Sequence, residues 1–258
     1  AELHGRPVIG LPGCARSPKL NGFDWVLDHI LTGQSFDDEK WAAMSVGGLL
    51  KEIKSRPKRR EPDSQTSKLK ITAAVLAGGL SRRMGKQNKL LQLYEGKPLI
   101  EHILAALKCA DLDQPFIVTG HQSEEIERIS RRYDMPMVFC PTFADGISET
   151  LKSAVTAAEP YDGVMICLAD MPKISEKHLD ILIKAFRRSK GKHICIAAHQ
   201  GKRGNPVILP KALFADVHLL EGDQGARALF HTYSDIVELV EVVDDSVFFD
   251  IDNPDDLL

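Results

Sequence analysis

From residue 70 onward, the sequence alternates between two patterns of hydrophobic and polar residues. Short apolar or β-branched runs, typical of buried strands, lie at 71–77, 115–120, 135–140, 163–170 and 193–198. Between them, apolar residues recur three and four positions apart, as in amphipathic helices, at 98–110, 123–133, 147–159 and 175–189. This alternation predicts an α/β fold of three layers, in which helices cover both faces of a mostly parallel sheet. Ligands of such sheets bind beyond the carboxyl ends of the strands, so we expect the functional site there.

The pattern is less regular near the end of the sequence. Segments 205–210, 223–233, 235–242 and 247–257 suggest further strands and short helices, with a final helix that begins near Pro254.

Residues 54–69 are polar, contain Pro57 and Pro62 and show no hydrophobic periodicity, as exposed linkers do. We therefore expect three parts, which are an N-terminal segment over 1–53, a linker over 54–69 and a main domain over 70–258. The basic cluster at 54–60 is interpreted as a solvated part of the linker, with contact to nucleic acid or lipid as the alternative.

Composition restricts the class of protein. Hydrophobic residues make up 43% of the 258 residues, which is enough for a buried core. No apolar run approaches the ~18 residues that a membrane-spanning helix needs. The five cysteines are odd in number and widely spaced, so we interpret them as reduced residues of a cytoplasmic protein rather than as metal ligands.

The net charge of −3 is unevenly distributed. Residues 1–68 carry 11 basic and 9 acidic side chains, which leaves 22 basic and 27 acidic side chains for residues 69–258. The larger part is acidic overall but concentrates positive charge at 82–89. This pattern argues against a general nucleic-acid surface and favours a local anion site.

That positive charge lies in the stretch LAGGLSRRMGKQNKL, residues 76–90, which follows the first predicted strand. The missing Cβ atoms of Gly78 and Gly79 allow backbone N–H groups to approach an anion directly. The stretch has no acidic residue and four basic ones, Arg82, Arg83, Lys86 and Lys89. It is not a Walker A loop, because Gly79 and Gly85 are one residue too far apart and Gln87 replaces the usual Ser or Thr. A nucleoside triphosphate would match this charge, and a tight turn beside a solvated basic loop is the alternative.

Polar side chains at two other predicted strand or helix ends are further candidates. Asp170 ends the apolar run 163–170, and a turn or a helix cap is its alternative role, although Ser175 is better placed to cap the next helix. Ser148 and Thr150 lie in the first turn of the helix predicted at 147–159. Their hydroxyl and N–H groups are candidates for contact with a phosphate or an acceptor, with ordinary capping as the alternative.

The stretch at 76–90 resembles the signature of the MobA-like nucleotidyltransferases, in which LAxGxSxRMGxxK follows the first strand of a Rossmann-like domain. Downstream segments extend the resemblance over nearly all of 70–258: GKPLIEH (96–102), DGISETLKSA (145–154), LADMP (168–172), RGNPVIL (203–209), GDQGAR (222–227) and DIDNPDDL (250–257). NKLL at 88–91 and the closing DIDNPDDL are most similar to the molybdenum cofactor cytidylyltransferase branch.

The resemblance implies a nucleotide site, a metal site and three catalytic residues, Arg83, Lys89 and Asp170. It implies that the nucleotide is held by Leu76, Ala77, Gly78, Gly79, Ser81, Arg83, Met84, Gly85 and Lys89. It also implies that Mg²⁺ is bound by Asp170 and Asp252, with Asp250 as the alternative to Asp252. Ser148 and Thr150 would then contact the acceptor or a phosphate.

The activity implied is transfer of CMP from CTP to molybdopterin or the molybdenum cofactor, with release of pyrophosphate. The alternatives are GTP in place of CTP, a sugar or polyol phosphate as the acceptor, and a cofactor-binding chaperone without turnover. A molybdoenzyme or chaperone is the expected protein partner, and neither nucleic acid nor a membrane is expected to bind.

Residues 5–33 are similar to the closing part of the molybdopterin-binding domain of the MogA, MoeA and CinA groups, especially in a strand followed by LPG. This similarity leads to the hypothesis that 1–53 is the C-terminal remnant of such a domain and that the chain is part of a two-domain protein. An unrelated helical extension is the alternative.

Overall fold

The structure is a computed structural model that describes residues 2–3, 6–7, 68–79, 88–120, 123–253 and 256. The chain divides into two units, 1–65 and 66–258. In the first unit, the described residues form an antiparallel pair of short strands, β1 (Glu2–Leu3) and β2 (Arg6–Pro7). Most of the predicted N-terminal remnant and linker lies outside the described residues, and their boundaries stay predictions.

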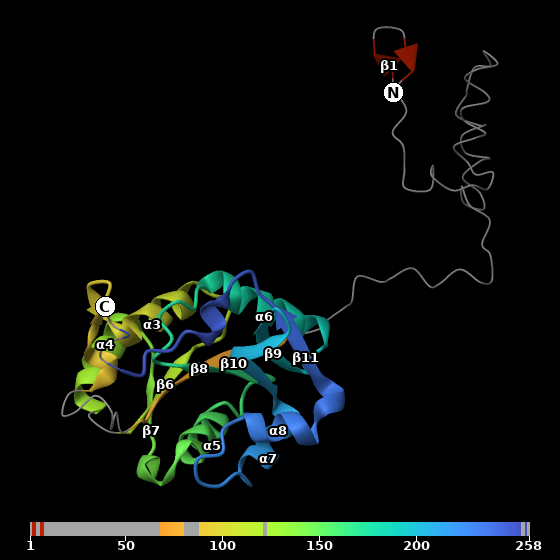
Figure 1. Ribbon diagram of the computed structural model, residues 1–258. Helices are drawn as coiled ribbons and strands as arrows, with labels where there is room; N and C mark the ends of the chain where they lie inside the picture. The colour runs from red at the N-terminus through yellow and green to blue at the C-terminus, as the bar shows by residue number, and fades with distance from the viewer. Residues whose placement is uncertain are drawn as a thin grey trace. The chain divides into compact units, whose positions relative to one another are not determined.

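The second unit is built on a seven-stranded sheet with the order β11-β9-β10-β8-β3-β6-β7 (Figure 1). Neighbouring strands are parallel except at β10, which runs antiparallel to both β8 and β9. The strands are β3 (Ile71–Ala77), β6 (Phe116–Thr119), β7 (Met137–Phe139), β8 (Gly163–Leu168), β9 (Ile194–His199), β10 (Lys202–Pro210) and β11 (Val237–Glu241). The expected mostly parallel sheet is confirmed.

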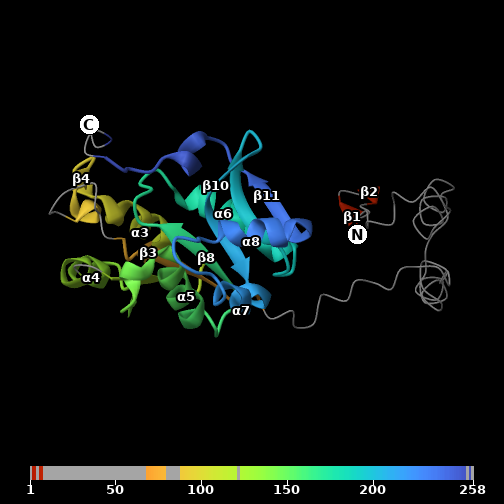
Figure 2. The ribbon, with the colours of Figure 1, turned by 60° about the horizontal axis from the view of Figure 1, so that its bottom comes forward.

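Helices cover both faces of this sheet, as Figures 1 and 2 show. One core joins the sheet to α3 (Leu99–Cys109), α4 (Ser123–Arg132) and α6 (Glu176–Arg188). The other joins it to α5 (Ile147–Ala157), α7 (Phe214–Val217) and α8 (Arg227–Thr232). Smaller elements are the hairpin of β4 (Leu93–Tyr94) and β5 (Lys97–Pro98) and the 3-10 turns η3 (Lys89–Leu91), η4 (Phe143–Asp145), η5 (Lys211–Leu213), η6 (Ser234–Ile236) and η7 (Asp245–Phe248).

The central strands β3 and β8 are almost entirely apolar because both of their faces are buried. In β3, Ala73 and Val75 belong to the first core, whereas Ala74 belongs to the second. In β8, Met165 and Ile166 divide between the two cores in the same way. Successive side chains of a strand point to opposite faces, so a strand between two helical layers needs apolar residues at nearly every position.

The order of the strands defines where a ligand is expected. From β3 the chain passes first to β6 and β7 on one side, and then to β8 and the remaining strands on the other. The carboxyl end of β3 is therefore the switch point of the sheet, where connections diverge and leave a crevice.

The end of the chain differs from the sequence pattern. Strand β10 is longer than the predicted 205–210, and residues 247–253 form the end of η7 and an irregular segment rather than a strand. Residues 254–255 and 257–258, where the final helix was predicted, lie outside the described residues. Within 68–79, 88–120 and 123–253, no helix combines the length and the apolar character needed to cross a membrane.

Candidate functional site

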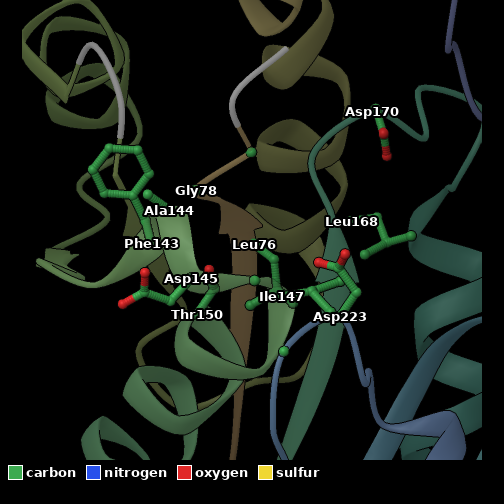
Figure 3. Close-up of a pocket in the computed structure, with 13 residues that line it drawn as sticks. Leu76, Gly78, Phe143, Ala144, Asp145, Ile147, Thr150, Leu168, Asp170 and Asp223 are labelled. Atoms are coloured by element: carbon green, nitrogen blue, oxygen red, sulfur yellow. The ribbon is translucent and has the colours of Figure 1, made fainter. Parts of the chain in front are cut away.

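A pocket of about 560 Å³ opens at the carboxyl end of β3 (Figure 3). It lies at the switch point between β3 and β8, as the topology predicts. Its walls come from four separate segments of the chain. The lining residues are Leu76, Gly78, Gly79, Phe143, Ala144, Asp145, Gly146, Ile147, Thr150, Leu168, Asp170, Gly222 and Asp223.

The two glycines after β3 have different physical roles. A Cβ atom on Gly78 would lie 2.9 Å from the hydroxyl oxygen of Thr150, whereas one on Gly79 would meet nothing within 4 Å. Gly78 therefore allows β3 to approach the first turn of α5. Gly79 leaves open space beside the backbone, where a phosphate has room to reach it.

The loop at 222–223 is fastened to the start of α5. The N–H group of Ser148 donates to the carbonyl oxygen of Gly222 at 3.1 Å. Gly146, the N-cap of α5, has φ +124°, and a Cβ atom there would lie 2.2 Å from the same carbonyl oxygen. This close approach requires glycine, and it holds Asp223 at the wall of the pocket.

Beside the pocket, the ammonium group of Lys89 lies between two carboxylates. Its Nζ atom is 2.8 Å from Oδ2 of Asp170 and 2.9 Å from Oδ1 of Asp252. Lys89 is the first residue of η3, whose N-cap Asn88 accepts a hydrogen bond from the N–H group of Leu90. The backbone of Lys89 is thus fixed by local hydrogen bonds, and its side chain, only 10% exposed, reaches across to the carboxylates.

The charges of this cluster are interdependent. Burial alone would lower the pKa of Lys89, but Asp170 and Asp252 outweigh this effect and raise the pKa above its usual value. A third carboxyl group, Asp250, has a raised pKa because of partial burial and the negative charges of Asp170 and Asp252. Lys89 is therefore firmly protonated and neutralises part of an acidic cluster.

The loop after β8 and the segment after η7 are joined by several contacts. The N–H group of Ile251 donates to the carbonyl oxygen of Asp170 at 3.1 Å, and Nζ of Lys173 lies 3.6 Å from the ring centroid of Phe249. At the start of α6, Nε2 of His178 lies 3.4 Å from a carboxylate oxygen of Asp244. The first two of these contacts join the segments that carry Asp170 and Asp252.

The pair Asp170 and Asp252 is chemically suited to a divalent cation. Oδ1 of Asp170 is buried and has no hydrogen-bond partner among the described residues, so one hard oxygen ligand is available. Mg²⁺ commonly uses one or two carboxylates together with substrate phosphates and water. No group of three or more His, Cys, Asp or Glu side chains suited to a metal occurs within the described ranges. Substrate phosphates and water would be the further ligands of a cation held by this pair.

The predicted site residues fall into four groups. Five line the pocket: Leu76, Gly78, Gly79, Thr150 and Asp170. Lys89 and Asp252 join Asp170 at its edge. Ala77 and Ser148 are buried and do not line the pocket. The remaining four lie outside the described residues: Ser81, Arg83, Met84 and Gly85.

Several lining residues had no role assigned from the sequence. Phe143, Asp145 and Gly146 come from η4 and its junction with α5, and Gly222 and Asp223 come from the GDQGAR segment. Figure 3 shows Phe143 and Asp145 on one side of the pocket and Asp223 on the other. The signal that could have found them is the pair of Asp and Gly residues in each segment, which is typical of tight turns.

Comparison with known proteins bears on these features. The family model described as the MobA-like NTP transferase domain matches residues 73–237, which include β8, most of β3 and the segments that line the pocket. The chain belongs to this family. The resemblance of the stretch at 76–90 is thereby confirmed at the level of the family. Asp252 lies beyond the matched residues.

Relatives within the MobA-like family carry different names. The purine catabolism protein PucB of Bacillus subtilis is 29% identical over 196 residues, which cover 72% of this chain and 93% of PucB. The molybdenum cofactor cytidylyltransferase of Escherichia coli is 28% identical over 194 residues, covering 73% of this chain and 94% of that protein. A molybdenum cofactor guanylyltransferase of Mannheimia succiniciproducens is 35% identical over 141 residues, which cover 54% of this chain and 69% of that protein.

Among solved structures, a homologue of Rv0371c from Mycobacterium sp. strain JC1 has a TM-score of 0.62 and 28% sequence identity, covering 72% of this chain and 92% of the homologue. A nucleotidyl transferase from Methanothermobacter has a TM-score of 0.63 and 23% identity, and the match covers 72% of this chain and 94% of that protein. This likeness supports the α/β fold. This MobA-like chain is therefore a nucleotidyltransferase with an α/β fold.

Proposed function

We propose that this nucleotidyltransferase moves CMP from CTP to the terminal phosphate of molybdopterin or the molybdenum cofactor. The support for this substrate pair is the cytidylyltransferase of Escherichia coli, whose match spans 94% of that protein, whereas the match to the Mannheimia guanylyltransferase spans 69%. The NKLL and DIDNPDDL segments also favour the cytidylyltransferase branch. We further propose that the reaction takes place in the cytoplasm, because the described cysteines are free thiols.

The chemistry is an in-line displacement at the α-phosphorus of CTP. An oxygen of the acceptor phosphate forms the new bond, and the bond from the α-phosphorus to the oxygen that bridges to the β-phosphorus breaks. Pyrophosphate leaves with that oxygen and its electron pair. The acceptor phosphate is already ionised, so this step needs no general base and no covalent enzyme intermediate.

Each charged residue has a role in this step. Backbone N–H groups at Gly78 and Gly79 and the ammonium group of Lys89 stabilise negative charge on the phosphates, with Arg83 as a further contact. Asp170 and Asp252 would hold Mg²⁺, which would screen the phosphate oxygens from each other and from the acceptor. The observation that carries the proposal is the convergence of Lys89, Asp170 and Asp252 at the edge of a glycine-lined pocket.

The test is pyrophosphate release by the full 258-residue chain with each of the four ribonucleoside triphosphates, in the presence of molybdopterin, of a sugar phosphate or of no acceptor. We expect release with CTP and only when molybdopterin is present. Release with GTP instead would assign a guanylyltransferase, and release with a sugar phosphate acceptor would assign another transferase. No release with any pair would contradict the proposal and favour a cofactor-binding protein.

Variants connect the activity to the site. Lys89→Ala is expected to reduce kcat/KM by about 10²- to 10³-fold, the usual loss when one stabilising charge or donor is removed. Asp170→Asn is expected to abolish Mg²⁺-dependent release. Lys108→Ala and Asp134→Asn are the matched controls. These two residues form an exposed ion pair at the C-terminal end of α3, with 3.8 Å between Nζ of Lys108 and Oδ2 of Asp134. Unchanged kcat/KM in Lys89→Ala would remove Lys89 from its role.

A further inference from the structure

The cation that pairs Asp170 with Asp252 belongs to the protein itself. Nζ of Lys89 is within hydrogen-bond distance of one oxygen of each carboxylate, at 2.8 Å and 2.9 Å. Two carboxylates that approach each other in a partly buried site repel unless a positive charge lies between them. The ammonium group supplies that charge here.

This position coincides with the place that a shared divalent cation needs. The two carboxylate oxygens cannot be farther apart than the 2.8 Å and 2.9 Å distances laid end to end. A Mg²⁺ ion takes oxygen ligands at about 2.0–2.1 Å, so an ion that joins these two oxygens must lie between them. An ammonium group and a divalent ion cannot occupy the same small space, and their charges repel each other.

The ammonium group has an alternative partner once a nucleotide is bound. The pocket beside it is lined by Gly78 and Gly79, and a triphosphate placed there brings several negative oxygens to the same edge. The backbone of Lys89 is held by η3, so only the flexible four-carbon side chain has to move. The lysine can therefore exchange carboxylate partners for phosphate partners without a change of fold.

We infer that Lys89 is an internal counter-ion that fills the divalent-cation position until a triphosphate draws its ammonium group away. Divalent cation and nucleotide then bind as a coupled pair, in which each raises the affinity for the other. The nucleotide-free enzyme keeps its carboxylates neutralised and binds the cation weakly. The inference rests on the proposed function because it uses a triphosphate as the displacing ligand.

Binding of Mn²⁺ alone, without nucleotide, tests this inference. Free Mn²⁺ is counted by its electron paramagnetic resonance signal in titrations of the full chain. Lys89→Met removes the competing charge, so we expect its Kd for Mn²⁺ to fall by at least about tenfold, within the usual range of coupling between sites. Lys89→Arg keeps the charge and is expected to bind Mn²⁺ as weakly as the natural chain. The control Lys108→Met is expected to bind Mn²⁺ with the same Kd as the natural chain.

A second substitution assigns the gained affinity to the proposed ligands. Asp170→Asn added to Lys89→Met is expected to cancel the gain. An equal or higher Kd in Lys89→Met than in the natural chain, with both chains folded by circular dichroism, would overturn the inference. A gain that survives Asp170→Asn would overturn it as well.

Thermal unfolding of the natural chain covers the case in which Lys89→Met does not fold. Mn²⁺ alone is expected to leave Tm unchanged, whereas Mn²⁺ with an unreactive α,β-methylene analogue of CTP is expected to raise Tm above the value with the analogue alone. If Mn²⁺ alone raised Tm as much as Mn²⁺ and the analogue together, the proposed exchange of partners by Lys89 would be contradicted. Pyrophosphate release by the natural chain is measured separately. A natural chain without any release, together with the expected gain of Mn²⁺ affinity in Lys89→Met, would refute the function and not the exchange.

Discussion

Replacing Gly146 by alanine tests how the pocket is held in shape. Gly146 combines φ +124° with a position at which a Cβ atom would lie 2.2 Å from the carbonyl oxygen of Gly222. A backbone conformation of this kind costs a residue with a side chain about 1–3 kcal/mol. The 222–223 loop must also move away, which breaks the hydrogen bond from Ser148 to Gly222 at a cost of about 0.5–1.5 kcal/mol. We therefore expect Gly146→Ala to lower the free energy of unfolding by about 2–4 kcal/mol.

Urea unfolding of the full chain measures this loss, and two other glycines separate its causes. Gly201 has φ +74° with nothing within 4 Å of a Cβ atom, so Gly201→Ala isolates the backbone cost, about 1–2 kcal/mol. Gly225 has no positive φ and an added Cβ would have one ordinary contact at 4.0 Å, so Gly225→Ala is expected to lie within about 0.5 kcal/mol of the natural chain. If Gly146→Ala were as stable as Gly225→Ala, the close approach of α5 to the 222–223 loop would be refuted.

Two further predictions concern charge and packing in the same unit. Hydrogen bonds from Arg187 and Lys68 lower the pKa of Asp111 to about 2. Its carboxylate therefore stabilises the fold at pH values above its ordinary pKa, and this stabilisation is lost as the pH falls toward 2. Unfolding measured against pH should show Asp111→Asn less stable than the natural chain at pH 7 and equally stable near pH 2. Phe186 is fully buried in α6, so Phe186→Ala is expected to lower the free energy of unfolding in urea by about 3–5 kcal/mol. Phe139 is 57% exposed, so Phe139→Ala should lower it far less. Equal losses in the two variants would contradict the described core.

The central strands were predictable because their physical signal is strong. The run at 71–77 coincides with β3, and 163–170 contains β8, since strands buried on both faces are apolar at nearly every position. Strand β10 was underestimated because Lys202 and Arg203 at its start are exposed and carry no hydrophobic signal. Its antiparallel direction follows from a tight turn at Gln200 and Gly201, both with positive φ, and apolar periodicity does not report direction.

The site was only partly accessible to sequence reasoning. Resemblance drew attention to Lys89, Asp170 and Asp252, and the structure brings these three side chains together. The segment before Asp252 was expected to be a strand because of its apolar residues. Its Ile251 N–H group instead donates to the loop carbonyl of Asp170, a long-range partner that no local pattern reveals. The wall at Asp223 was missed for the same reason, since its place depends on a backbone contact with α5.

The ammonium bridge also has a consequence for the order in which the protein is made. Lys89 and Asp170 are 81 positions apart, whereas Lys89 and Asp252 are 163 apart. On the ribosome, β3 and β8 can pair and the first carboxylate can meet the lysine long before residue 252 has been synthesised. A nascent chain of that length therefore has only one of the two carboxylates that contact Lys89. The contact of Lys89 with both carboxylates is complete only after all seven strands of the sheet, the last of which is β11, have been synthesised.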